Sequence, residues 1–155
     1  MIGYTIGNVE SHPIIAVDCL SSTAQHEISK TIRKAFILLT AYMQETGTMP
    51  MGPAVTLYHS IDEEQAHFSL GYPVAEADLQ KVKDGIKVVY IPGGKVAKAV
   101  HQGPYSSMFQ TYVEIYERMR EAGLEHRGAA WEVYLNSSGQ TPKEEMLTEI
   151  YISVH

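Results

Sequence analysis

Apolar and polar residues alternate along the C-terminal segment of the chain. One face of this run would hold Thr148, Ile150, Ile152 and Val154, and the other Leu147, Glu149, Tyr151 and Ser153. Because successive side chains of a strand point to opposite faces, residues 146–154 are predicted to form a strand with one core face. The second face carries a carboxylate, Glu149, beside apolar neighbours. An ionised carboxylate in such surroundings is costly unless water or a partner offsets the cost.

Two longer segments show the helical period instead. Apolar residues recur three and four positions apart in 21–47, at Ile28, Ile32, Phe36, Leu39 and Met43. They recur likewise in 103–123, at Tyr105, Met108, Tyr112, Tyr116 and Met119. Each segment ends in a glycine, Gly47 or Gly123, which is typical of a helix C-terminus. The sequence therefore predicts two amphipathic helices.

Short β-branched and aromatic runs between these helices predict further strands. They cover residues 12–20, 54–60, 65–74, 87–91, 94–102 and 131–135. The segment "YIPGGK" is interpreted as a hairpin turn joining the fourth and fifth of these strands. Residues 75–85 are polar and predict a connector with room for a helical turn, and residues 136–144 predict a loop.

The order strand, helix, strand, strand occurs twice. "AYMQETG" (41–47) aligns with "ERMREAG" (117–123), and "SLGYPV" (69–74) with "EIYISV" (149–154). The alignment predicts one domain with a first repeat at about 9–75, a connector at about 76–87 and a second repeat at about 88–155.

Two such repeats would form an α+β fold with pseudo-twofold symmetry. An amphipathic helix cannot bury its apolar face alone, so both long helices should pack on one face of an antiparallel sheet. The other face would stay uncovered. Ser69 aligns with Glu149, so the acid belongs to one repeat only.

Composition narrows the class of protein. The chain has 155 residues, 45% of them hydrophobic and 19% charged, which suits one globular domain. Its net charge of -6 disfavours a nucleic-acid surface. Cys19 is the single cysteine, so an intrachain disulfide is impossible and a reducing compartment is expected. Without a signal peptide or a long apolar run, we expect a cytoplasmic domain with no membrane contact.

The second half of the sequence resembles a known family. "YIPGGKVAKAVHQGPYSSMFQTYVEIYERM", "WEVYLN" and "TPKEEMLTEIYISV", together with the earlier "GYPV", resemble the GyrI-like small-molecule-binding family. That family includes effector-binding domains of multidrug-responsive regulators and stand-alone proteins. The resemblance is strong over 66–155, where "PGG", H-x-G-P-Y and T-E-I-Y-x-x-V occur in order, and it is weaker over 1–60.

The resemblance implies a doublet of strand–helix–strand–strand units with a ligand cleft on the exposed sheet face between the halves. It also implies that Glu149 matches an acid which contacts cationic, aromatic ligands in the multidrug regulators. Some stand-alone members resemble hydrolases that open strained cyclopropane rings of DNA-alkylating natural products. Others interact with a topoisomerase.

Glu149 is the main candidate site residue. A half-buried carboxylate among aromatic rings attracts a ligand cation, and a ring face adds roughly 0.5–2 kcal/mol of cation–π attraction. Alternatively, Glu149 could act as the catalytic general base that activates water. The structural alternative is an ion pair with an arginine, for which the candidates are Arg118, Arg120 and Arg127.

Aromatic residues near Glu149 are further candidates for ligand binding. Tyr151 shares its strand face. Trp131 and Tyr134 lie on a neighbouring strand at odd spacing, so at most one of them faces Glu149, and Trp131 could instead belong to the core.

Four more candidates lie elsewhere in the predicted fold. His101 and Tyr105 flank the strand-to-helix connection, where polar side chains often converge on a pocket. The alternative for His101 is an exposed strand position. Tyr72 and Tyr90 are pocket candidates from the first half and its connector.

Several other chemistries lack support in the sequence. The seven histidines form no His-Glu-x-x-His motif or close pair, so no metal site is predicted. No cofactor is predicted either: no axial histidine for haem stands out, and "PGGK" lacks the spacing of a phosphate loop. Cys19 has no obvious base and no Gly-x-Ser-x-Gly motif is present, which disfavours covalent catalysis.

The sequence therefore favours a stand-alone protein that binds a hydrophobic, aromatic and in some cases cationic small molecule through Glu149. The first alternative is a hydrolase in which Glu149 activates water against a cyclopropane-type electrophile, with a tyrosine hydroxyl as proton donor. The second is an interaction protein that inhibits a protein partner. Direct binding of nucleic acid is not expected.

Overall fold

The computed structural model describes residues 1–136 and 140–155, and the chain divides into two compact units. Unit 1 contains residues 1–11 and 92–155, and unit 2 contains residues 12–91. Residues 137–139 of the predicted loop lie outside the described residues.

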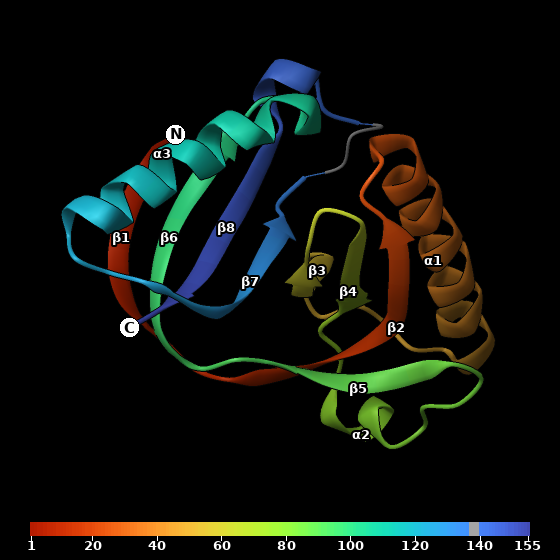
Figure 1. The fold of residues 1–155 in the computed structure, drawn as a ribbon. Helices are drawn as coiled ribbons and strands as arrows, with labels where there is room; N and C mark the ends of the chain where they lie inside the picture. The colour runs from red at the N-terminus through yellow and green to blue at the C-terminus, as the bar shows by residue number, and fades with distance from the viewer. Residues whose placement is uncertain (137–139) are drawn as a thin grey trace. The chain divides into compact units, whose positions relative to one another are not determined.

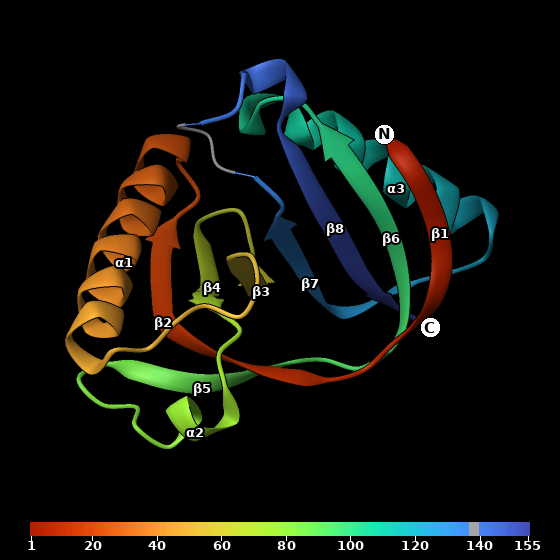
Figure 2. The ribbon, with the colours of Figure 1, turned by 180° about the vertical axis from the view of Figure 1, so that it is seen from behind.

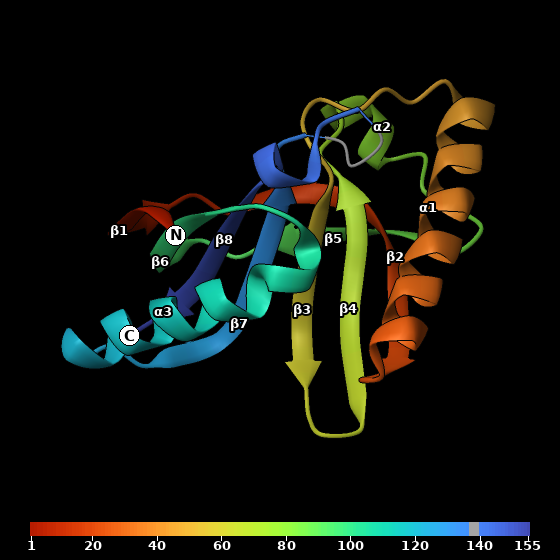
Figure 3. The same cartoon turned by 90° about the horizontal axis from the view of Figure 1, so that it is seen from above.

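Unit 2 consists of an antiparallel sheet of four strands with one long helix (Figure 1). The elements are β2 (His12–Ser22), α1 (Gln25–Thr46), β3 (Val55–Ile61), β4 (Gln65–Tyr72), α2 (Glu76–Leu79) and β5 (Ile86–Ile91). The strand order is β3-β4-β2-β5. Figure 3 shows β3 and β4 joined by a short turn, with α1 running beside β2.

The core of unit 2 lies between α1 and its sheet. Val17 and Cys19 of β2 and Phe68 of β4 pack in one cluster with Leu39 of α1. The helix ends at Gly47, whose φ of 69° is left-handed and suits glycine. Since strand side chains alternate, the residues between these core positions point to the face opposite α1.

Unit 1 has the same architecture. Its elements are β1 (Ile2–Val9), β6 (Gly94–Gln102), η1 (Tyr105–Ser107), α3 (Met108–Glu121), β7 (His126–Tyr134), η2 (Lys143–Glu145) and β8 (Leu147–Val154). The strand order is β1-β6-β8-β7. Figure 2 shows this sheet from the side opposite α3.

The core face predicted for the C-terminal strand is confirmed. Ile150, Ile152 and Val154 are buried and belong to one cluster with Ile115 and Met119 of α3. One face of β8 therefore packs against α3. The other face, which carries Glu149, points away from α3.

The α+β fold class is confirmed, with the strand–helix–strand–strand order present in both units. β2, α1, β3 and β4 correspond to β6, α3, β7 and β8. Each unit has a fourth strand that pairs with the first strand of its strand–helix–strand–strand repeat, β5 with β2 and β1 with β6. The predicted helical turn in the connector is α2. Among the described residues, no helix has the length and apolar composition needed to cross a membrane.

Two details of the strand prediction are wrong. The strand β1 was not predicted, because glycines and exposed positions interrupt its alternating pattern. The hairpin at "YIPGGK" does not form, since β5 pairs with β2 whereas β6 pairs with β1 and β8. A Cβ at Gly93 would lie 2.8 Å from the backbone nitrogen of Ser11. This glycine therefore permits close approach of two chain segments rather than a tight hairpin turn.

A glycine in unit 2 provides a test of the packing of β4 against β2. A Cβ at Gly71 would lie 2.0 Å from the carbonyl oxygen of Ile15, so Gly71→Ala forces the two strands apart. We expect the free energy of unfolding to fall by about 1–3 kcal/mol or more, measured by urea denaturation. Gly7→Ala in β1 is the control, because its Cβ meets nothing within 4 Å. Equal stability of the two variants would contradict this packing.

Candidate functional site

Glu149 lies near the middle of β8, on the sheet face of unit 1 that points away from α3. Its cross-strand neighbours are Val100 on β6 and Val133 on β7. The side chain is 19% exposed. The carboxylate is therefore half-buried between two apolar neighbours, which is the situation that the sequence pattern indicated.

Both oxygens of this carboxylate have partners within the chain. Lys98 Nζ lies 2.9 Å from Oε2. The Tyr151 hydroxyl donates a hydrogen bond of 3.2 Å to Oε1. Lys98 can reach Glu149 because it lies opposite Tyr151 in the register of β6 and β8, on the same face and diagonal to the acid.

The structural alternative for Glu149, an ion pair within the chain, is present, but its partner is Lys98 and none of the three candidate arginines. Arg118 and Arg120 lie on α3, which packs on the other face of the sheet, and Arg118 lies over the Tyr4 ring at 5.3 Å. The guanidinium of Arg127 lies beside Gly94, about 3.2 Å from where a Cβ would be. The missed partner, Lys98, had a sequence signal: it is the one charged residue within "VAKAV", a run whose other members are small and apolar.

An aromatic pair completes the site. The rings of Trp131 and Tyr151 are stacked, with centroids 5.3 Å apart and planes at 7°. Lys98 Nζ lies 5.3 Å from the centroid of Tyr151, within cation–π range. We call Glu149, Tyr151, Lys98 and Trp131 the Glu149 cluster. In it, one ammonium contacts a carboxylate and an aromatic face at the same time.

Two titratable side chains of the cluster have raised pKa values. The hydrogen bond to Glu149 raises the pKa of Lys98 above the ordinary lysine value. Burial, and then the charge of Glu149, raise the pKa of Tyr151. At neutral pH the cluster therefore holds a charged ammonium and a neutral phenol.

Trp131 and Tyr134 lie on opposite faces of β7, as their spacing predicted. Trp131 is the one that shares the face of Glu149 and is 2% exposed. Tyr134 instead lies on the α3 side, where its hydroxyl donates a hydrogen bond of 2.8 Å to Glu132 Oε1. Tyr105 packs edge-on against Tyr134, with ring centroids 5.6 Å apart.

Glu132 is a buried acid that the sequence analysis did not single out. It also accepts a hydrogen bond from the Tyr112 hydroxyl of α3. Burial, and then the charge of Glu132, raise the pKa of Tyr105. The signal that could have found Glu132 is the one that found Glu149: a carboxylate inside an otherwise apolar strand.

His101 has a structural role at the start of the α3 segment. It is buried, so its interpretation as an exposed strand residue is wrong. Its Nε2 lies 2.9 Å from the Pro104 carbonyl oxygen, which can only accept, so this nitrogen carries a proton. Its Nδ1 lies 2.7 Å from the Thr111 hydroxyl. The two ring nitrogens thus contact α3 and the segment that leads into it.

Tyr72 and Tyr90 belong to unit 2. Tyr72 packs edge-on against Phe36 at 6.3 Å and, with Met43 and Thr48, lines a pocket of about 350 Å³. Burial raises the pKa of Tyr72. Tyr90 is 62% exposed on β5.

Cys19 is part of the core of unit 2 rather than a nucleophile. Burial, with a smaller effect of the neighbouring Asp18 charge, raises the pKa of the thiol to about 11. The thiol therefore stays protonated at neutral pH, whereas the thiolate is the reactive form.

Comparison with known proteins identifies the family. Residues 4–155 match the GyrI-like small molecule binding domain, which confirms the resemblance noted in the sequence. No curated protein matches the chain.

Solved structures share the fold at low sequence identity. The EcmrR–DNA complex is 18% identical with a TM-score of 0.83, and the match covers 99% of this chain and 57% of that one. SAV2435 bound to tetraphenylphosphonium is 13% identical with a TM-score of 0.66, covering 99% and 94%. A hydrolase from Listeria innocua is 19% identical with a TM-score of 0.65, covering 98% and 91%. At these identities the likeness concerns the fold alone.

The raised pKa of Lys98 predicts how the ion pair contributes to stability as pH changes. Below the ordinary lysine pKa of 10.5, Lys98 is charged in both states and the contribution is fully present. It is lost as the pH rises through the raised pKa of the folded state. We expect Lys98→Met to be less stable than the wild type at neutral pH, with the difference shrinking as the pH rises above 10.5.

Urea unfolding, followed by the fluorescence of the single tryptophan, measures this difference. Lys95→Met removes an exposed lysine of the same strand and serves as the control. A difference between Lys98→Met and the wild type that does not change with pH would contradict the assignment.

Proposed function

Because the chain belongs to the family of GyrI-like small-molecule-binding domains, we propose that it binds an aromatic cation on the face of unit 1 that carries Glu149. The position of the Lys98 ammonium carries this proposal. The ammonium lies 2.9 Å from a carboxylate oxygen of Glu149 and 5.3 Å from the centroid of Tyr151. It therefore marks the place that the positive charge of a ligand would take.

A ligand cation can compete with Lys98 on energetic grounds. The Lys98 side chain is 36% exposed, and a partly exposed ion pair of this kind contributes at most about 1 kcal/mol. Its flexible chain lets the ammonium move into water when it is displaced. An aromatic cation would replace both electrostatic contacts of the ammonium. It would also bury apolar surface against Tyr151, at about 25 cal/mol for each Å².

The proposed ligand is thus flat or ring-bearing, hydrophobic and positively charged. Tetraphenylphosphonium is a suitable probe because it combines a diffuse charge with aromatic rings. The structural neighbour SAV2435 has been solved with this cation, which supports the choice of probe.

The hydrolase alternative has weaker support. The Tyr151 hydroxyl lies close enough to Glu149 to serve as a proton donor. Both carboxylate oxygens, however, already accept hydrogen bonds, from Lys98 and from Tyr151. One of these bonds would have to break before Glu149 could activate a water molecule. Within residues 1–136 and 140–155, no structural observation favours the second alternative, inhibition of a protein partner, over small-molecule binding.

Opposite effects of two substitutions test the proposal. Glu149→Gln removes the charge that attracts the probe and should weaken tetraphenylphosphonium binding about tenfold, or about 1.4 kcal/mol. Lys98→Met removes the competing ammonium and should strengthen binding several-fold. Quenching of Trp131 fluorescence measures both affinities, because this residue is the single tryptophan and stacks on Tyr151.

The matched controls are Glu144→Gln and Lys95→Met, which remove exposed charges of the same unit and should leave the affinity unchanged. Equal affinity of Glu149→Gln and the wild type would overturn the role of the carboxylate. Weaker binding by Lys98→Met would show that the lysine contacts the ligand rather than competing with it.

A further inference from the structure

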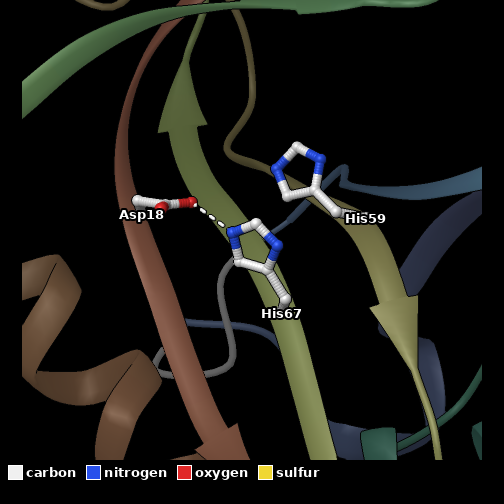
Figure 4. A group of neighbouring side chains, drawn as sticks. All are labelled: Asp18, His59 and His67. Atoms are coloured by element: carbon white, nitrogen blue, oxygen red, sulfur yellow. Dashed lines mark hydrogen bonds and ion pairs between the residues drawn. The ribbon is translucent and has the colours of Figure 1, made fainter.

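A second polar cluster lies within unit 2, on strands that are adjacent in its sheet. Asp18 of β2, His59 of β3 and His67 of β4 point toward one another (Figure 4). One potential ligand atom from each residue lies within 4.8 Å of those of the other two. The sequence analysis found no close histidine pair because these residues are far apart along the chain, and strand pairing brings them together.

The register of the strands explains the arrangement. Asp18 is opposite Ser69 in the pairing of β2 with β4, and His67 is two residues before Ser69 on the same face. The pairing of β3 with β4 shifts between Tyr58 and Ser60, which identifies His59 as the extra residue of a bulge. Bulges re-aim side chains, and here the bulge brings the His59 ring to 4.6 Å from the His67 ring.

Hydrogen bonds organise the cluster in two pairs. His67 Nε2 lies 2.8 Å from Asp18 Oδ1, and His59 Nε2 lies 2.7 Å from the Ser69 hydroxyl. The Ser69 hydroxyl also lies 3.4 Å from Asp18 Oδ1. A serine–histidine–acid relay would need one imidazole to contact both the serine and the acid. Since the two contacts involve different histidines, the geometry does not match a nucleophilic triad.

We propose that Asp18, His59 and His67 bind a divalent transition-metal ion of the Zn²⁺ or Co²⁺ type. Two imidazoles and one carboxylate are a donor set that these ions favour, and three protein ligands leave a fourth position for water. Zinc–nitrogen and zinc–oxygen bonds are about 2.0–2.2 Å long, so the three donors must move slightly closer together. Asp18 and His59 are exposed, which gives their side chains room for this movement.

The other polar groups around the cluster suit such a site. The Ser69 hydroxyl is buried and within hydrogen-bond distance of His59, so it can orient the ring as an outer-shell partner. Lys87 Nζ lies 4.0 Å from the second oxygen of Asp18. This ammonium opposes a bound cation, but it is exposed and can move into water. The site would link three strands of unit 2, whereas the residues of the Glu149 cluster belong to unit 1.

Titration of the purified chain with Co²⁺ tests the proposal, because ligand-field absorption reports coordination directly. We expect binding of one ion per chain, displaced by Zn²⁺. His59→Ala and His67→Ala should each weaken Co²⁺ binding by at least about tenfold. Removing a residue that only hydrogen-bonds to a metal ligand already costs about tenfold, and each histidine is proposed as a direct ligand. Asp18→Asn should also weaken binding, since it keeps the shape of the side chain but removes its charge.

Two other histidine–carboxylate pairs provide matched controls. His26 lies 3.3 Å from Glu27 and His155 lies 3.4 Å from Glu125. Substituting His26 or His155 by alanine should leave Co²⁺ binding unchanged. Circular dichroism of every variant confirms that it is folded.

The results of these experiments distinguish the proposed metal site from the proposed binding of an aromatic cation. Glu149→Gln should bind Co²⁺ as the wild type does, so failure of either proposal leaves the other standing. No saturable Co²⁺ binding by the wild type would overturn the metal site. Binding that survives in folded His59→Ala and His67→Ala, or that is lost in the His26 or His155 variant, would overturn it as well.

Discussion

The alternation of side chains along antiparallel strands is the constraint on which both units depend. In each unit, one long helix packs on one face of a four-stranded sheet and takes up the apolar residues of every second position. The positions between them point the other way and do not pack against α1 or α3. Polar groups such as Glu149 and Asp18 can occupy those positions without disrupting the core, so each sheet offers a face on which chemistry can be placed.

The Glu149 cluster shows how a charged residue is tolerated on such a face. A carboxylate flanked by Val100 and Val133 would be costly if it were unpaired, and Lys98 offsets that cost. The same ammonium lies over the Tyr151 ring, which is itself stacked on Trp131. The chain therefore provides its own cation at a place suited to an aromatic cation. Binding of a ligand would then exchange one positive charge for another, so the net electrostatic gain would be small. Apolar contact with the rings of the cluster would therefore favour ligands that carry aromatic rings.

The two units share the same order of elements but carry different polar residues at corresponding positions. Glu149 is opposite Val100 in unit 1, whereas the corresponding position in unit 2 holds Ser69 opposite Asp18. With His59 and His67 nearby, the second arrangement is the one for which we propose a metal ion, whereas for the first we propose an organic cation. A frame held by helix–sheet packing tolerates this divergence, because the residues that changed lie outside the core clusters.

The sequence alone determined the amphipathic helices, most strands, the repeat and the buried face of β8, because these features depend on local periodicity. It also singled out Glu149, since one carboxylate in an apolar strand is visible without coordinates. Only the tertiary structure decided which side chains meet across strands. Glu149 pairs with Lys98 and not with a candidate arginine, Trp131 rather than Tyr134 lies on the face of Glu149, and Asp18 lies near His59 and His67. The physical reason is that strand register and bulges are determined by pairing between distant segments, and a shift of one residue moves a side chain to the other face.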